Sequence, residues 1–240
     1  MRAMRIFMGV GRLHPLASLQ FEMNMLPVKW EAMKRSIEFW VHVMRLGEGR
    51  LLKEVKRETM KFGGRVQWVK DLKIGLEAFG WQGLDMQALR GLSLSEVKHI
   101  LKCTAWRRAR EGWREEAKVR PKLEVMGRLM DCRCEARCVE VDCKRQRRML
   151  MKLRGGTAEL RIETGRWCGL QRDVRICNMC DEREVEDVEH FLLHCNGMAE
   201  ERKEMVKVMN EIMEGWQEMD MDGKDKVVCV VDKACENGWV

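Results

Sequence analysis

The stretch 93–119, SLSEVKHILKCTAWRRAREGWREEAKV, decides the fold class of this chain. Its apolar residues recur every four positions and charged residues fill the positions between them, which is the pattern of an amphipathic α-helix. Ser93 and Glu96 have the spacing of a capping box, in which each satisfies a free N–H group of the other at a helix start. We therefore predict a helix from Ser93 onward, with a buried stripe formed by Val97, Leu101, Ala105, Ala109 and Trp113.

The same pattern continues on both sides of this stretch. Residues 30–46, 50–62 and 66–81 carry apolar side chains at helical spacing and are separated by glycines. Residues 198–216 predict another long helix, whereas the tail 222–240 fits either a helix or a strand. With only 3 prolines and no tyrosine in 240 residues, the composition favours a mainly α protein, a helical bundle.

Pro121 marks a boundary in the chain, because proline cannot continue the preceding helix. We expect a helical region over 1–120, a region with a basic helix and a metal-binding domain over 121–197, and a C-terminal helix and tail over 198–240.

The net charge and the cysteine content limit the classes of protein to which this chain can belong. The net charge is +7, which is weak support for a polyanionic partner, and the 11 cysteines follow no apolar export signal. No segment reaches the roughly 20 apolar residues of a membrane span. We therefore expect an intracellular protein with reduced thiols and no membrane partner, in either the nucleus or the cytoplasm.

The sequence CNMCDEREVEDVEHFLLHC, residues 177–195, has the spacing of a metal site. A C-x2-C turn presents Cys177 and Cys180, and His190 and Cys195 follow an acidic loop. Four such ligands predict a closed, structural Zn²⁺ site in a small C-terminal knuckle made of a short hairpin plus a helix. Two alternatives stay open: His194 as the fourth ligand, and cysteines that are simply buried in a core.

A second group of cysteines precedes this motif. Its members are Cys132, Cys134, Cys138 and Cys143. Their C-x-C-x3-C-x4-C spacing lacks the usual pair, spacer and pair, so we expect semi-buried cysteines rather than a second zinc site.

A dense basic run lies between the two cysteine groups and continues to the metal motif. Beside a zinc knuckle, such side chains suit phosphate contacts and base stacking; the alternative is the solvated face of an ordinary helix. The residues predicted to bind nucleic acid are Lys144, Arg145, Arg147, Arg148, Lys152, Arg154, Arg161, Arg166 and Trp167.

Three segments, RIETGRW (161–167), VRICNMC (174–180) and VEDVEHFLLHC (185–195), together resemble the zinc-binding region near the C-terminus of non-LTR (LINE-like) retrotransposon reverse transcriptases. That family pattern reads R-x-E-T-G-R-Y, E-R-x-C-x-x-C and E-D-E-x-H-x-L-x-x-C. Residues 1–55 are similar to the segment after the polymerase domain, and RPKLEVMGRLM (120–130) is similar to the family's K-P-K-L-R-x-Y. The likeness covers most of residues 1–220.

The resemblance implies Cys177, Cys180, His190 and Cys195 as ligands and leaves His194 outside the motif. Trp167 replaces the family tyrosine, and CNGMAEER replaces its C-P-x-Y ending. The chain has no Asp-Asp pair for a polymerase site and no signature of a catalytic nucleophile, so we expect no enzyme and no small-molecule substrate. We expect a C-terminal fragment that binds RNA or single-stranded or template DNA; the alternative is a structural or protein-interaction remnant.

Overall fold

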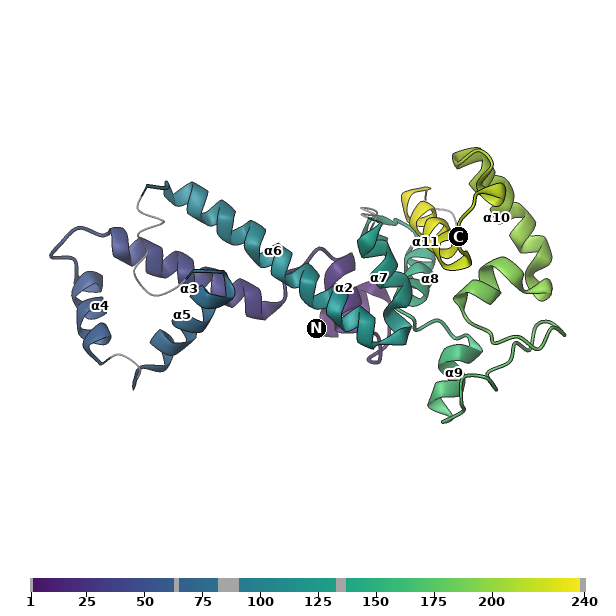
Figure 1. Ribbon diagram of the computed structural model, residues 1–240, viewed down its shortest axis with the longest axis horizontal. Helices are drawn as coiled ribbons and strands as arrows, with labels where there is room; N and C mark the ends of the chain where they lie inside the picture. Colours follow the sequence, from purple (N-terminus) through teal and green to yellow (C-terminus); the bar gives the residue numbers. More distant parts are fainter. Residues whose placement is uncertain (1, 63–64, 82–90, 133–136, 238–240) are drawn as a thin grey trace. The chain divides into compact units, whose positions relative to one another are not determined.

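The structure is a computed structural model that describes residues 2–62, 65–81, 91–132 and 137–237 (Figure 1). Throughout these residues it is mainly helical, and the β-structure within them is limited to one isolated antiparallel bridge between Ile176 and Val185. The mainly α fold predicted from the sequence is therefore confirmed. No helix in the described part of the chain is both long enough and apolar enough to cross a membrane.

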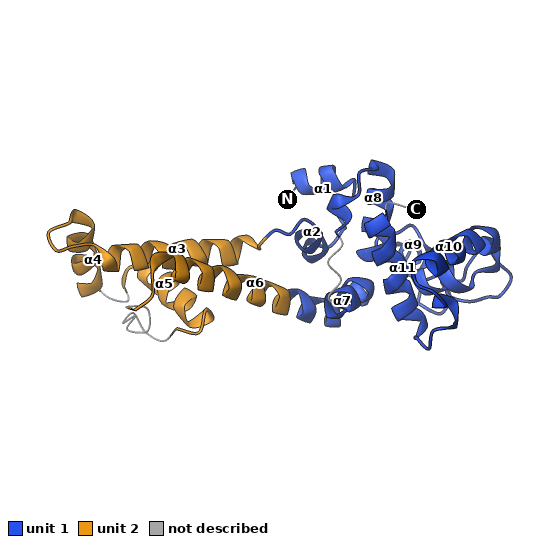
Figure 2. Ribbon diagram, turned by 90° about the horizontal axis from the view of Figure 1, so that it is seen from above, with its two compact units in different colours: residues 1–25, 113–240 blue, residues 26–112 orange. Residues whose placement is uncertain are grey.

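The chain divides into two compact units, residues 26–112 and residues 1–25 with 113–240 (Figure 2). This division differs from the boundary placed at Pro121. The N-terminal 25 residues belong to the same unit as the C-terminal half because their apolar side chains, including Met4, Met8 and Leu19, enter its core.

The unit formed by residues 26–112 is built from amphipathic helices. Its core joins three of them through Ile37, Leu76, Leu101 and their neighbours, and the stripe predicted from Val97 to Ala105 is fully buried there. The capping box also forms: the Ser93 N–H donates to Glu96 Oε2 at 2.6 Å, and the Glu96 N–H donates to Ser93 Oγ at 3.2 Å. The helices of this unit are α3 (Val28–Arg45), α4 (Leu51–Lys61), α5 (Gln67–Ala78) and the first part of α6 (Leu94–Val119).

Apart from the end of α6, the other unit contains α-helices of 7 to 15 residues and several single turns of 3-10 or π-helix. The tail whose conformation was left open between helix and strand is an α-helix, α11, with the buried valines 227, 228, 230 and 231 on its inner side. The helices of this unit are α1 (Arg2–Met8), α2 (Leu16–Glu22), η3 (Pro121–Leu123), α7 (Glu124–Asp131), η4 (Cys138–Glu140), α8 (Lys144–Arg154), α9 (Arg161–Trp167), η5 (His190–His194), η6 (Asn196–Met198), α10 (Ala199–Ile212), η7 (Trp216–Glu218) and α11 (Gly223–Asn237).

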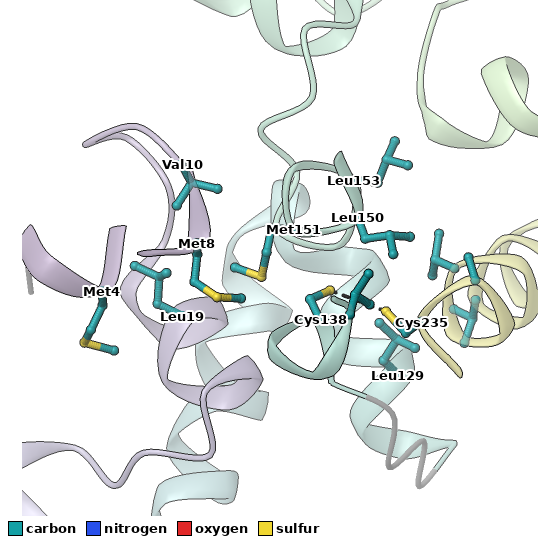
Figure 3. Close-up of a cluster of buried hydrophobic side chains, with 14 residues drawn as sticks. Met4, Met8, Val10, Leu19, Leu129, Cys138, Leu150, Met151, Leu153 and Cys235 are labelled. Atoms are coloured by element: carbon teal, nitrogen blue, oxygen red, sulfur yellow. Dashed lines mark hydrogen bonds between the residues drawn. The ribbon is translucent and has the colours of Figure 1, made fainter. Parts of the chain in front are cut away.

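The core of this unit gathers side chains from distant parts of the sequence. Figure 3 shows Met8 and Leu19 from the N-terminal helices facing Leu150 and Met151 of α8, with Leu129 of α7 beside them. Burying these side chains removes apolar surface from water, which stabilises the folded state by roughly 1.5–3 kcal/mol for each large side chain. Helix α8 therefore has a buried side that contains Leu150, Met151 and also Arg154, whereas Lys144, Arg145 and Arg148 are exposed.

One charged pair lies inside this core. Arg154 and Glu22 are both 0% exposed, and Arg154 Nε lies 2.8 Å from Glu22 Oε1. Burial alone would lower the pKa of Arg154, but the Glu22 carboxylate and two nearby sulfurs outweigh it and raise that pKa, so the guanidinium stays charged. The second carboxylate oxygen, Glu22 Oε2, accepts the Cys138 N–H at 2.8 Å. The pair therefore connects α2, α8 and η4.

Replacing Arg154 with methionine should lower the free energy of unfolding by about 3–5 kcal/mol, because Glu22 would remain buried without its counter-charge. Arg148→Met, the same change at an exposed position of the same helix, should alter the free energy of unfolding by less than about 0.5 kcal/mol. Urea denaturation followed by circular dichroism measures both. Equal effects of the two substitutions would contradict a structural role for the buried pair.

Candidate metal centre

A short hairpin presents the first two cysteines of the motif. The Cys177 N–H donates to the Glu184 carbonyl at 2.8 Å, and the Glu186 N–H donates to the Arg175 carbonyl at 3.0 Å, on either side of the Ile176–Val185 bridge. The C-x2-C sequence therefore forms part of the connection between the paired segments. This backbone pairing fixes Cys177 directly and places Cys180 in the connection between the paired segments.

A π-helical turn, η5, supplies the other two side chains. The Cys195 N–H donates to the His190 carbonyl at 2.7 Å, five residues back, which is the wider hydrogen-bond spacing of a π-helix. The Asp187 carboxylate accepts the His190 N–H at 3.0 Å and so satisfies the start of the turn. This turn allows His190 and Cys195 to face the same point although they are not at α-helical spacing.

The four side chains converge on one point. The ligand atoms of Cys177, Cys180, His190 and Cys195 all lie within 4.8 Å of one another. Cys177 Sγ is 3.7 Å from Cys195 Sγ, and Cys180 Sγ is 3.4 Å from His190 Nε2. A tetrahedral centre with sulfur ligands at about 2.3 Å has S–S edges of about 3.8 Å. The group therefore has the size and donor set to hold a metal ion.

His190 is oriented by a carboxylate. Its Nδ1 lies 3.0 Å from Glu184 Oε2, which leaves Nε2 turned toward Cys180 and the centre of the group. Metal-bound histidines commonly hydrogen-bond a carboxylate in this way, which fixes the ring and its tautomer. Glu184 was not among the residues predicted for the site; its signal in the sequence is a carboxylate close to the candidate ligand His190.

His194 does not join the group. Its side chain is 54% exposed, and its Nε2 lies 3.7 Å from Glu189 Oε1, whereas His190 is 3% exposed. A second set of possible ligands, Glu182, Glu184 and His190, shares His190 but consists otherwise of exposed carboxylates. The cysteine-containing group is the better metal site because its ligands are more buried and include three sulfurs.

The pKa values of the ligand side chains are shifted in different directions: the Glu182 N–H, His190 and the neighbouring cysteines lower the pKa of Cys180 through hydrogen bonds. Burial and the neighbouring cysteines raise the pKa of Cys177 to about 11, although the Met179 N–H partly opposes the shift. Burial lowers the pKa of His190, but Glu184 and Cys180 outweigh it, so this pKa is raised overall. A metal cation would displace these protons, because thiolate and neutral imidazole are the forms that bind.

The hairpin also holds helix α9. Glu186 is the connection: its carbonyl accepts the Ile162 N–H at 3.0 Å, and its carboxylate accepts the Arg161 N–H at 2.6 Å. Arg175, one residue before the bridge, donates to the Ile162 carbonyl at 2.8 Å. Any agent that fixes the hairpin therefore also fixes α9. Neither Glu186 nor Arg175 could be assigned this role from residue types alone.

The RIETGRW motif has a structural explanation in α9. A Cβ atom at Gly165 would lie 2.7 Å from the Arg175 side chain, so glycine permits the close approach of helix and hairpin. Glu163 is buried and accepts from both Arg166, at 2.7 Å, and Trp167 Nε1, at 3.3 Å. Trp167 is nevertheless 56% exposed, so its indole is oriented at the surface rather than packed in a core.

The residues predicted to bind nucleic acid are exposed, half-buried or, in the case of Arg154, fully buried. Lys144, Arg145 and Arg148 are exposed on α8, and Arg166 and Trp167 are exposed on α9. Arg147, Lys152 and Arg161 are half-buried. Arg147 donates to the Val141 carbonyl at 3.0 Å and lies 4.8 Å from the centre of the Phe7 ring, and Lys152 pairs with Glu159.

Arg154 requires a correction to the predicted binding surface. Its guanidinium lies in the core and is 0% exposed, so it cannot reach a phosphate. The helical periodicity of α8 explains the difference, because Arg154 follows Leu150 by one turn and shares its buried side. The basic run therefore contains residues with different roles.

The earlier cysteine group does not form a site in the described residues. Cys132 and Cys143 are exposed and Cys138 is buried, while Cys134 lies outside the part that the structure describes. The expected semi-buried positions are not found at Cys132 and Cys143, which are exposed, or at Cys138, which is fully buried. Cys138 has a different partner, described below.

Comparison of the chain with family models, curated proteins and solved structures finds no match. The capacity of Cys177, Cys180, His190 and Cys195 to hold a metal ion therefore rests on their own geometry.

Substitution of His190 by alanine should abolish the tetrahedral absorption bands of the Co²⁺-loaded protein or weaken Co²⁺ affinity by more than about 100-fold. Loss of a group that only hydrogen-bonds to a ligand already weakens metal affinity by about 10–100-fold. The matched change His194→Ala should leave both the spectrum and the affinity unchanged. Titration with Co²⁺ under reducing conditions measures the two variants side by side. A loss caused by His194→Ala and not by His190→Ala would assign the fourth ligand to His194.

Removing the carboxylate beside His190 should weaken metal binding without changing the ligand set. We expect Glu184→Ala to lower the affinity for Zn²⁺ by about 10–100-fold, measured by competition with a chromophoric chelator. Glu182→Ala, a matched change in the same loop, should have little effect. If Glu182→Ala were as damaging as Glu184→Ala, the carboxylate-containing set would be the metal site instead.

Proposed function

We propose that this chain is a non-catalytic nucleic-acid-binding module in which a structural Zn²⁺ fixes a basic and aromatic surface for RNA or single-stranded or template DNA. The observation that carries the proposal is the attachment of α9, with exposed Arg166 and Trp167, to the hairpin that bears Cys177 and Cys180. The motifs that resemble the C-terminal region of non-LTR retrotransposon reverse transcriptases support the same assignment and an origin in such an element.

A structural role for the metal is supported by how little else holds this region together. Among residues 160–198, all of which the structure describes, Leu160 at 8% exposure is the most buried aliphatic side chain, and Val188, Leu192 and Leu193 pack partly buried against neighbouring cores. This limited apolar burial contributes little against the conformational entropy of ordering the segment. Zinc bound to three sulfurs and one imidazole would supply the missing stabilisation, because binding free energy becomes folding free energy.

The closed set of ligands supports a non-catalytic role. Three cysteines and one histidine complete a tetrahedral Zn²⁺, and a catalytic zinc keeps one position for water or substrate. A hydrolytic role would require one of the four residues to be dispensable for metal binding. The Co²⁺ titration described above also tests that requirement.

The exposed side chains suit a single-stranded partner. Trp167 presents an indole face on which an unpaired base can stack, and Glu163 restrains its orientation. Lys144, Arg145 and Arg148 are exposed on α8, and none of these three is held in an ion pair with another described residue. They are therefore available for phosphates without first breaking a contact.

Binding to a single-stranded RNA oligonucleotide should separate the contribution of phosphate contacts from that of base stacking on Trp167. The double substitution Arg145→Ala and Arg148→Ala should make the slope of log K against log salt less steep by about 1.4, because each lost phosphate contact removes about 0.7. Trp167→Ala should weaken binding by about 1–3 kcal/mol at one salt concentration with little change in slope, and Trp167→Phe should retain most of the affinity. Fluorescence anisotropy across a salt series measures both effects.

Arg57→Ala with Lys61→Ala serves as the matched control, since it removes the same charge from exposed positions of α4 in the other unit. We expect it to leave the salt slope near that of the unchanged protein. A zinc-loaded, folded chain that did not bind RNA or single-stranded DNA at low salt would reject the proposal and favour a structural or protein-interaction role.

A further inference from the structure

Two buried cysteines from distant parts of the chain face each other in the core of the unit formed by residues 1–25 and 113–240. Cys138 in η4 and Cys235 in α11 are 0% and 7% exposed, and their Sγ atoms are 3.5 Å apart (Figure 3). Neither belongs to the metal centre. In Figure 3 the two side chains point toward one another, so the contact is made by the sulfurs themselves.

A buried cation lies against one of the two sulfurs. Arg154 Nη1 donates to Cys235 Sγ at 2.8 Å, while Arg154 Nε pairs with Glu22. Glu22 also accepts the backbone N–H of Cys138. The four groups thus form one connected cluster in which the guanidinium touches Cys235 and the carboxylate holds the backbone of Cys138.

The cluster makes the two cysteines chemically unequal. Hydrogen bonding from Cys138 and the charge of Arg154 lower the pKa of Cys235, and these effects exceed the opposing effect of burial. Burial raises the pKa of Cys138 well above its usual range, and the contact with Cys235 adds to the shift. Cys235 is therefore the sulfur that carries thiolate character, and Cys138 is the neutral thiol beside it.

We propose that Cys138 and Cys235 are a redox-modification site, in which hydrogen peroxide converts the facing thiols to a disulfide that links η4 to α11. The pair is separated by 97 positions in sequence, so the bond would close a long loop of the chain. The proposal is independent of the metal centre and of nucleic-acid binding.

The reaction balances with peroxide as the only oxidant. The Cys235 thiolate attacks one peroxide oxygen, the O–O bond breaks, and the departing hydroxide takes the Cys138 proton to leave as water. The resulting sulfenic acid of Cys235 is attacked by Cys138 sulfur, which forms the S–S bond and releases hydroxide. That hydroxide takes up a proton from solvent and becomes a second water, so two thiols and one peroxide give one disulfide and two waters.

The geometry permits this closure with small movements. A disulfide S–S bond is about 2.05 Å long, so the sulfurs must approach by roughly 1.5 Å from their 3.5 Å separation. Cys235 keeps a small exposed fraction through which peroxide can enter, while Cys138 has none, which matches their order of reaction. Forming the disulfide also removes the thiolate charge beside Arg154, which keeps its ion pair with Glu22.

A metal ion is a poorer occupant of the same place. The Arg154 guanidinium, already 2.8 Å from Cys235 Sγ, would repel a cation bound to that sulfur. The two sulfurs also belong to neither group of possible metal ligands among the described residues. Facing thiols beside a buried cation fit oxidation instead.

The test uses the full, zinc-loaded chain treated with limiting hydrogen peroxide and then blocked with N-ethylmaleimide under denaturing conditions. Peptide mapping without reduction should find a Cys138–Cys235 peptide, lighter by two hydrogens than the separate thiol peptides, as the main cross-link. The same treatment of the urea-unfolded chain should distribute cross-links among many cysteine pairs. Recovery of both residues as maleimide adducts, at a peroxide concentration that oxidises exposed Cys168, would overturn the proposal.

Two variants identify the order of reaction. Cys138→Ala should remove the cross-link and allow dimedone to trap a sulfenic acid at Cys235, an adduct that the unchanged protein should not accumulate. Cys229→Ala, a matched change on α11, should still give the Cys138–Cys235 peptide. The assigned roles also predict which thiol dimedone labels faster. If Cys138 in the Cys235→Ala variant were labelled faster than Cys235 in the Cys138→Ala variant, the assigned roles would be contradicted. Circular dichroism confirms that each variant is folded, and the measurement on the unchanged protein decides the proposal if a variant is not.

Discussion

The buried ion pair between Arg154 and Glu22 is the constraint on which the unit formed by residues 1–25 and 113–240 depends. A charge removed from water is costly unless a counter-charge and hydrogen bonds accompany it, so each partner obliges the other to remain in place. The pair fixes α8 against α2 at one particular rotation. That rotation puts Leu150 and Met151 in the core and leaves Lys144, Arg145 and Arg148 at the surface.

The region from Leu160 to Met198 is held mainly by hydrogen bonds rather than by a buried ion pair and an apolar core. It has almost no apolar core, and its backbone contacts run through the hairpin that bears Cys177 and through Glu186. A metal at the cysteine and histidine group would act as the cross-link that small, loop-rich segments require. Helix α9 depends on that hairpin, so the orientation of Trp167 would depend on the metal although Trp167 does not touch it.

The cysteines illustrate how the same residue type acquires different chemistry from its surroundings. Cys177 lies with two other sulfurs and an imidazole, and burial there raises its pKa, so a bound cation would favour its thiolate form. Cys235 already has a cation beside it, the Arg154 guanidinium, which favours thiolate and disfavours a metal. Cys168, exposed on the surface, has neither arrangement. The positions of charged neighbours therefore suit one group of cysteines to metal binding and the other to the oxidation proposed above.

The sequence by itself determined most of the helices and the group of residues that can hold a metal ion. The period of Val97, Leu101 and Ala105 and the capping box at Ser93 are local properties, and the structure confirms them because burial of one stripe is how such a helix becomes stable. The spacing of Cys177, Cys180, His190 and Cys195 is likewise local, although the preference for His190 over His194 came from the resemblance. The predicted association with nucleic acid stays a prediction.

Only the tertiary structure decided which residues of the basic run are surface and which are core. Arg154 looks like its neighbours in the sequence, and its burial depends on Glu22, which lies more than a hundred residues earlier. The facing of Cys138 and Cys235 has the same origin, as do the support of His190 by Glu184 and of α9 by Glu186. These pairings are set by the packing of distant segments, and residue type and periodicity carry no record of which distant partner a side chain will meet.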